Sequence, residues 1–141
     1  MADPATIVRQ YTDAWNRRDW DTFRSLMGPG YSYTGGDGQR QDGPEAGLAL
    51  AQMWAAAFPD AKLHIKHIHT AGDTAIEEFS AAGTHQGALM GIAPTGRKID
   101  MPICDVIEVR DGKVHAEREY FDMAHLMQQL GVGVMPTPAT A

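Results

Sequence analysis

The chain lacks several features that would assign it to a particular class of protein. Cys104 is its single cysteine, so no disulfide can form within the chain, and a cytoplasmic setting is expected. Its 12 Lys and Arg residues cluster on no predicted face and are outnumbered by 18 Asp and Glu, which argues against a nucleic-acid partner. The apolar runs near the N-terminus are too short for a signal peptide or a membrane span, so no membrane partner is expected.

Helical patterns occupy the first part of the chain. Asp3 followed by Pro4 is typical of a helix start, and apolar residues then recur every three or four positions as far as Trp15. Asp19 is positioned to cap a second, shorter helix. A third helix is predicted to begin at Pro44, and because it is apolar around much of its circumference we expect it to be well covered.

Strands are predicted for most of the remaining chain. Asp111-Gly112 separates two runs of strand-forming residues and indicates a β-hairpin. The expected strands cover residues 31–33, 63–70, 74–85, 98–109 and 114–122, and a closing helix covers 123–130. Helices followed by a meander of long strands indicate an α+β fold, with a curved antiparallel sheet and helices on one face. We place this single domain over residues 1–135 and expect a disordered tail over 136–141.

Strand alternation predicts which side chains point inward. Three adjacent strands each present an apolar face, whose polar members are Glu77, His85, Asp105, Arg118 and Asp122. The opposite phase of the last strand, which carries His115, Glu117 and Glu119, is expected to be solvated or partly interfacial. A one-residue bulge in any of these strands would reverse its assignment locally. Buried charges need partners or a function. The inward group is therefore interpreted either as an acid/base site with raised carboxylate pKa values or as an ionic cluster in which Arg118 bridges Asp105 and Asp122.

Four short segments carry a resemblance to a known family. They are Ala14-Trp15-Asn16 with Asp19, Gly83-Thr84-His85-Gln86-Gly87, Gly91-Ile92-Ala93-Pro94-Thr95-Gly96, and Arg110-Asp111-Gly112-Lys113 leading to Tyr120-Phe121-Asp122 and Gln129-Leu130-Gly131. In this order and spacing they resemble the SnoaL-like polyketide cyclases of the nuclear transport factor 2-like superfamily. The resemblance implies an α+β cone, in which a curved antiparallel or mixed sheet wraps around one apolar pocket behind N-terminal helices. It also implies a homodimer that works without metal or cofactor.

The resemblance further implies roles for individual residues. Asp122 matches the strand-end aspartate that shuttles a proton during an intramolecular aldol closure, and His85 is a candidate for the assisting histidine. The expected activity is therefore that of a polyketide cyclase-like lyase or isomerase acting on a small hydrophobic carbonyl compound. Residues expected to shape its pocket are Tyr11, Trp15, Tyr33, Trp54, Phe79 and Tyr120, for which plain core packing is the alternative.

Two other functions remain open at this point. Arg118 between Asp105 and Asp122 is reminiscent of limonene-epoxide-hydrolase sites, in which aspartates and an arginine activate water and protonate an epoxide. A small-ligand binder without catalysis is the other alternative, because this fold hosts many functions. His67 and His69 share a strand face with no carboxylate at ligand spacing, so we interpret them as surface histidines rather than as a metal site.

Overall fold

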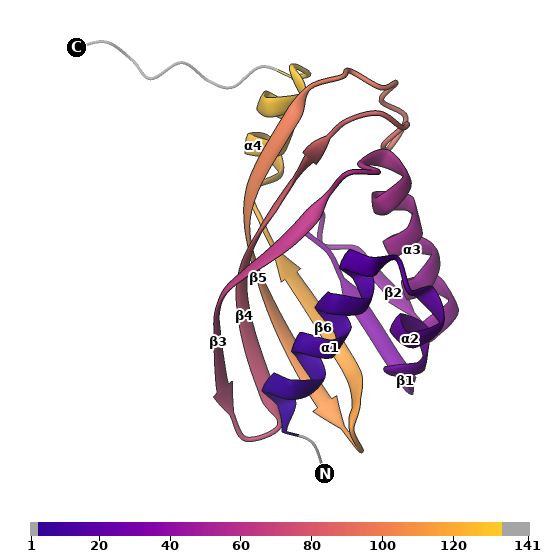
Figure 1. Ribbon diagram of the computed structural model, residues 1–141, viewed down its shortest axis with the longest axis vertical. Helices are drawn as coiled ribbons and strands as arrows, with labels where there is room; N and C mark the ends of the chain where they lie inside the picture. The colour runs from indigo at the N-terminus through magenta and orange to yellow at the C-terminus, as the bar shows by residue number, and fades with distance from the viewer. Residues whose placement is uncertain (1–2, 134–141) are drawn as a thin grey trace, which may run out of the picture.

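The computed structural model describes residues 3–133 and has the predicted order of helices followed by long strands (Figure 1). Its elements are α1 (Pro4–Arg17), α2 (Trp20–Ser25), β1 (Met27–Thr34), β2 (Arg40–Asp42), α3 (Pro44–Ala57), β3 (Lys62–Ala71), β4 (Thr74–Thr84), β5 (Lys98–Arg110), β6 (Lys113–Tyr120) and α4 (Met123–Leu130). The tail expected over 136–141 lies outside the described residues. None of the helices within residues 3–133 combines the length and hydropathy that crossing a bilayer requires.

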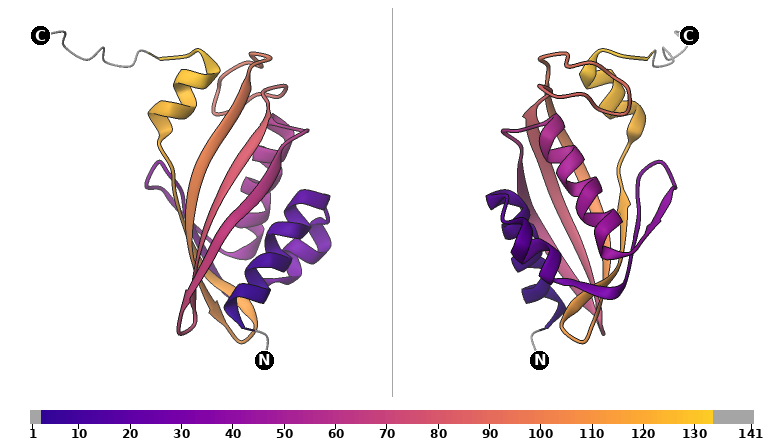
Figure 2. Two further views of the ribbon diagram at one scale, coloured as in Figure 1. Left: turned by 60° about the vertical axis from the view of Figure 1, so that its left-hand side comes forward. Right: turned by 90° about the vertical axis from the view of Figure 1, so that its right-hand side faces the viewer.

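The six strands form one curved, open sheet in the order β2-β1-β6-β5-β4-β3. Neighbouring strands are antiparallel except for β1 and β6, which pair in parallel, so the sheet is mixed. The helices α1, α2 and α3 lie on one face of this sheet, and α4 packs against β5 (Figure 2). This architecture confirms the predicted α+β class and the nuclear transport factor 2-like fold.

Helix α1 is fixed at both ends by interactions that the sequence encodes locally. Asp3 accepts a hydrogen bond from the Thr6 N–H at 2.8 Å, and Arg18 ends the helix in the left-handed conformation with φ 57°. The Arg18 guanidinium then donates to the carbonyl groups of Phe58, Pro59 and Ala61 and covers the Trp15 ring at 4.2 Å. Arg18 thereby ties the end of α1 to the α3–β3 connection.

The β5–β6 hairpin has the predicted turn but not the predicted register. Asp111 and Gly112 have φ angles of 53° and 72°, as a two-residue turn of type I′ requires. Val109 pairs with Val114 but Glu108 pairs with Ala116, so His115 is an extra residue in β6. Because such a bulge reverses the alternation beyond it, the predicted inward face of Arg118, Tyr120 and Asp122 was wrong. Glu117 and Glu119 face inward in their place, among the residues that line a pocket.

Candidate active site

A pocket of about 130 Å³ lies between the helices and the inner face of the sheet. Five of the six residues predicted to shape a pocket line it: Tyr11, Trp15, Tyr33, Trp54 and Phe79. Tyr120 does not, because it lies on the outer side of β6 with 56% of its surface exposed, so that prediction was wrong. Most other lining side chains are apolar, among them Phe23, Leu50, Phe58, Met101, Ile103 and Phe121.

Four carboxylates interrupt this lining and are called the carboxylate cluster below: Glu77, Asp105, Glu117 and Glu119. Strand pairing brings three of them into one row, because Glu77 on β4 lies opposite Asp105 on β5, which lies opposite Glu119 on β6. Carboxylate oxygens of Asp105, Glu117 and Glu119 lie within 4.8 Å of one another. Side chains from three adjacent strands therefore place several acidic groups at one position in the pocket wall.

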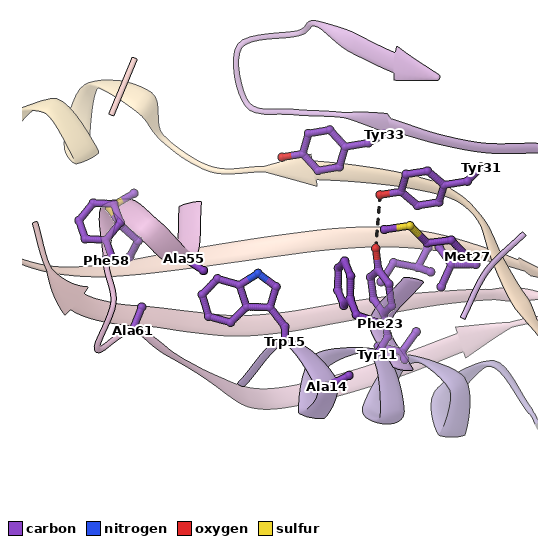
Figure 3. Close-up of a cluster of buried hydrophobic side chains, with 14 of the residues drawn as sticks. Tyr11, Ala14, Trp15, Phe23, Met27, Tyr31, Tyr33, Ala55, Phe58 and Ala61 are labelled. Atoms are coloured by element: carbon purple, nitrogen blue, oxygen red, sulfur yellow. Dashed lines mark hydrogen bonds between the residues drawn. The ribbon is translucent and has the colours of Figure 1, made fainter. Parts of the chain in front are cut away.

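Hydroxyl groups from α1 and β1 hold the outer members of the cluster. Tyr11 and Tyr31 both donate to Oε2 of Glu117, at 3.0 and 2.8 Å, and their hydroxyls lie 3.3 Å apart (Figure 3). Tyr33 donates to Oε1 of Glu119 at 2.8 Å. Thr12 donates to Oε2 of Glu77 at 2.7 Å. These donors fix the positions of three carboxylates that water would otherwise solvate.

Asp105 is the central member of the cluster, paired across the sheet with Glu77 and Glu119. It is 3% exposed and lines the pocket, and its Oδ1 has no hydrogen-bond partner among residues 3–133. Asp105 also shares hydrogen bonds with Glu117 and Glu119, which requires a proton between each pair of carboxyl groups. The arrangement is that of a buried carboxyl group in the pocket wall that shares protons with two neighbouring carboxyl groups.

Burial sets the protonation of the cluster. Loss of solvation, opposed by the Thr12 hydroxyl, raises the pKa of Glu77 to about 7. Burial and the charge of Glu117 likewise raise the pKa of Glu119 to about 7. The pKa of Asp105 is raised well above its ordinary value by burial and then by the charges of its carboxylate neighbours. Burial also raises the pKa of Glu117, but hydrogen bonds from Asp105, Tyr31 and Tyr11 oppose that rise. Glu117 is therefore suited to hold negative charge and Asp105 to hold a proton.

Two residues predicted to be catalytic lie outside this pocket. Asp122 is exposed at the N-terminus of α4, where its side chain accepts a hydrogen bond from the His125 N–H at 3.1 Å. Arg118 forms an ion pair with Glu108 and does not line the pocket. Because Asp105 alone of the predicted Asp105–Arg118–Asp122 group lines the pocket, the expectation that these three side chains meet was wrong.

His85, the third predicted catalytic residue, is fully buried beside the pocket rather than in its lining. Its ring lies 5.4 Å from that of Phe58, and its Nδ1 accepts a hydrogen bond from the Thr95 N–H at 3.1 Å. The His85 backbone also bonds to Arg97 and Gly96. These contacts hold the ends of the β4–β5 loop together, and they give no direct access to a pocket ligand.

Tyr31 offers a test of how strongly the hydroxyl groups support the cluster. Tyr31→Phe leaves Glu117 with one tyrosine donor in place of two, so we expect the free energy of unfolding at pH 7 to fall by about 1.5 kcal/mol. Urea unfolding measures this difference. Tyr120→Phe removes the same group from the exposed outer face and should change stability by less than about 0.5 kcal/mol. Equal effects of the two changes would contradict the role given to Tyr31.

Comparison with known proteins identifies the family of this chain. The sequence profile of the SnoaL-like polyketide cyclase family matches residues 5–130. Aklanonic acid methyl ester cyclase AcmA of Streptomyces galilaeus is 27% identical, over 93% of this chain and 92% of the relative. The corresponding cyclase DnrD of Streptomyces peucetius is also 27% identical, over 98% and 97%.

Solved structures show the same fold. The candidate polyketide cyclase IdmH of Streptomyces antibioticus superposes with a TM-score of 0.80 at 29% identity, over 93% of this chain and all of the other. A SnoaL-like protein of Jannaschia sp. CCS1 has a TM-score of 0.86 at 22% identity, over 93% of each chain. Since the family profile spans nearly the whole sequence, this chain belongs to the SnoaL-like polyketide cyclase family.

Proposed function

We propose that the protein closes a ring in a hydrophobic carbonyl compound by intramolecular aldol addition, with the carboxylate cluster as its acid and base. The observation that carries this proposal is the group formed by Asp105, Glu117 and Glu119, whose carboxylate oxygens lie within 4.8 Å of one another in the wall of an otherwise largely apolar pocket. Membership of the cyclase family supports the reaction class. The aromatic side chains around the pocket support a flat, hydrophobic substrate.

The reaction needs one group that accepts a proton and later returns it. The Asp105 carboxyl group takes the proton from the carbon next to a substrate carbonyl, while its own proton passes to Glu119. The C–H bond breaks and an enolate forms. The enolate carbon attacks a second carbonyl carbon of the same molecule, so that a C–C bond forms and the carbonyl π bond becomes an alkoxide. Reversal of the proton transfer through Asp105 protonates the alkoxide, and the enzyme regains its starting state.

The raised pKa values suit this cycle. A carboxyl group with a pKa of about 7, as in Glu119, is present in both forms at neutral pH and is a stronger base than an exposed glutamate. Tyr11 and Tyr31 keep negative charge on Glu117, which favours the proton on Asp105 between turnovers. The arrangement thus supplies an acid and a base from one connected set of side chains.

A conversion assay tests the proposal. The compound named for the curated relatives, aklanonic acid methyl ester, is the first substrate, and a simpler aromatic 1,5-diketone that can close a six-membered ring is the second. We expect a cyclic product of unchanged mass, because aldol addition rearranges bonds without adding or losing atoms. A product heavier by one water would indicate hydrolysis instead. Binding of both compounds without conversion would indicate a non-catalytic ligand binder.

The epoxide-hydrolase alternative has little support from the positions of its residues. It needs Arg118 and Asp122 in contact with the ligand beside Asp105, and neither residue lines the pocket.

Two other expectations, the homodimer and the cytoplasmic location, stay predictions. Sedimentation of the purified protein would test the first.

A further inference from the structure

Helix α3 has one glycine in its interior, Gly47, and the helix itself does not require it. The other residues of α3 include six alanines, and alanine is more favourable than glycine in a helix because it loses less conformational freedom on folding. The φ angle of Gly47 is negative, so alanine could adopt the same backbone conformation. Gly47 is buried and lines the pocket. The reason for a glycine at this position therefore lies in what its surface contacts.

The ring of Tyr31, from β1, fills the space beside Gly47. A Cβ atom at position 47 would lie 2.3 Å from Cε1 of that ring and 3.0 Å from its Cζ. Rotation of the ring about its long axis would not relieve the second contact, because Cζ lies on that axis. A side chain at position 47 would therefore displace the end of the ring that carries the hydroxyl group.

Hydrogen bonds of the backbone oppose a retreat of the helix from the ring. The Gly43 N–H, just before α3, donates to the carbonyl oxygen of Tyr31 itself at 2.8 Å. The Gly47 N–H donates in turn to the carbonyl oxygen of Gly43 at 3.2 Å. The first turn of α3 is thus tied to the backbone of the residue whose ring it contacts. The adjustment to a side chain at position 47 then falls on the Tyr31 ring.

The hydroxyl group at the end of this ring supports the carboxylate cluster. Tyr31 is 2% exposed, and its hydroxyl donates to Oε2 of Glu117 at 2.8 Å. This hydrogen bond opposes the rise that burial causes in the pKa of Glu117. A contact of 3.0 Å at Cζ requires a displacement of a few tenths of an ångström, and a hydrogen bond weakens when its donor leaves the preferred position. The absence of a side chain at position 47 therefore affects Glu117.

We propose that Gly47 is a positioning residue for the carboxylate cluster: because it has no side chain, the Tyr31 ring packs directly on α3 and its hydroxyl reaches Glu117. The catalytic consequence rests on the proposed cyclisation, in which negative charge on Glu117 keeps a proton on Asp105. The effect on the ionisation of Glu117 does not rest on that reaction and can be measured without a substrate.

A pH titration of the Glu117 carboxyl carbon by ¹³C NMR tests the proposal. The titratable groups around Glu117 are Tyr11 of α1, Tyr31 and Tyr33 of β1, Glu77 of β4, Asp105 of β5 and Glu119 of β6. Tyr31→Phe removes one donor and should raise the titration midpoint by about 0.5–1 pH unit. Gly47→Ala should raise it by at least about half as much, because it displaces the same hydroxyl. Adding Gly47→Ala to Tyr31→Phe should cause no further rise, since the hydroxyl is already absent.

Gly28→Ala is the matched control, because it makes the same exchange on β1 without a clash. A Cβ atom at position 28 would lie at ordinary distances of 3.5 Å from the Val114 carbonyl oxygen and 3.6 Å from Cβ of Lys113. Its Glu117 midpoint should equal that of the unmodified protein. A residue that serves packing alone would lower stability and leave the midpoint unchanged, so an unchanged midpoint in Gly47→Ala would overturn the proposal. A further rise in the Tyr31→Phe background would overturn it too.

The cyclisation assay gives a separate readout. In Gly47→Ala the acid limb of the pH profile of kcat/KM should move to higher pH by the same amount as the Glu117 midpoint. A protein that closes no ring in any variant would refute the proposed function, while the titration would still decide the role of Gly47.

A second pair of variants decides the proposal if Gly47→Ala does not fold. Tyr31→Val removes the ring, so Gly47→Ala should fold in this background and raise the thermal midpoint of unfolding, because alanine favours the helix. Loss of folding in this double variant, or a lower thermal midpoint than in Tyr31→Val, would show that something other than the Tyr31 ring excludes a side chain at position 47. Either result would overturn the proposal.

Discussion

Asp105→Asn is expected to lower kcat/KM for cyclisation by about 10²–10⁴-fold, the usual contribution of general acid–base catalysis. Asparagine has nearly the same shape as aspartate, but it can neither accept the substrate proton nor pass one to Glu119. Most of the loss should appear in kcat, since the walls that bind the substrate are unchanged. Steady-state rates at several pH values measure both constants.

Asp122→Asn is the control for this change. Asp122 is exposed at the start of α4, and asparagine caps helices as well as aspartate does, so activity and stability should both stay near those of the unmodified protein. The opposite result, with Asp122→Asn inactive and Asp105→Asn active, would return the catalytic role to the strand-end aspartate that the family resemblance implied. Urea unfolding of both variants separates a catalytic loss from a folding defect.

The elements that the sequence predicted correctly are encoded by local chemistry. Asp3 and Pro4 start α1, and Asp111-Gly112 forms the β5–β6 turn, because each pair favours one local conformation whatever surrounds it. Strand β5 alternates apolar and polar side chains over most of its length, so its inward face, including Asp105, could be assigned. Glu77 on β4 was assigned inward for the same reason.

Strand β6 could not be assigned in this way. Beyond Ala116 it carries Glu117, Arg118, Glu119 and Tyr120, so no apolar alternation marks which side is buried. The bulge at His115 decides which side chains of β6 face inward. It arises because Glu108 pairs with Ala116 while Val109 pairs with Val114, which leaves His115 unpaired. The predicted site therefore contained Arg118 and Asp122 and missed Glu117 and Glu119.

The tyrosine donors depend on a contact between distant parts of the chain. The parallel pairing of β1 with β6 sets Tyr33 beside Glu117 in register, and it brings Tyr31 and Tyr33 to the carboxylate cluster. The sequence predicts a short strand at this place but not its neighbour, because parallel pairing leaves no turn signal between the two strands. Half of the cluster and most of its hydrogen bonds could therefore be identified only once the fold was known.

Glu77→Gln should make the protein more stable at high pH but not at low pH. Glu77 is 2% exposed, and its pKa is about 7 in the folded protein against an ordinary value of 4.5. Between pH 4.5 and pH 7 the folded state therefore binds more protons than the unfolded state. The contribution of Glu77 to the free energy of unfolding is fully present below about pH 4.5 and is lost as the pH rises through 7. The two pKa values differ by about 2.5 units and each unit corresponds to about 1.4 kcal/mol, so the loss from this residue is about 3.5 kcal/mol.

Glutamine imitates the protonated carboxyl group and still accepts the hydrogen bond from Thr12, but it cannot ionise. The free energy of unfolding of Glu77→Gln should therefore match that of the unmodified protein at pH 4 and exceed it by about 3.5 kcal/mol at pH 8.5. Glu78→Gln changes the next, exposed residue of β4 and should differ from the unmodified protein by less than about 0.5 kcal/mol at both pH values. Urea unfolding at the two pH values supplies all six measurements. A difference for Glu77→Gln that does not grow with pH would mean that Glu77 ionises as readily in the folded protein as in the unfolded chain, and the raised pKa assigned to its burial would be wrong.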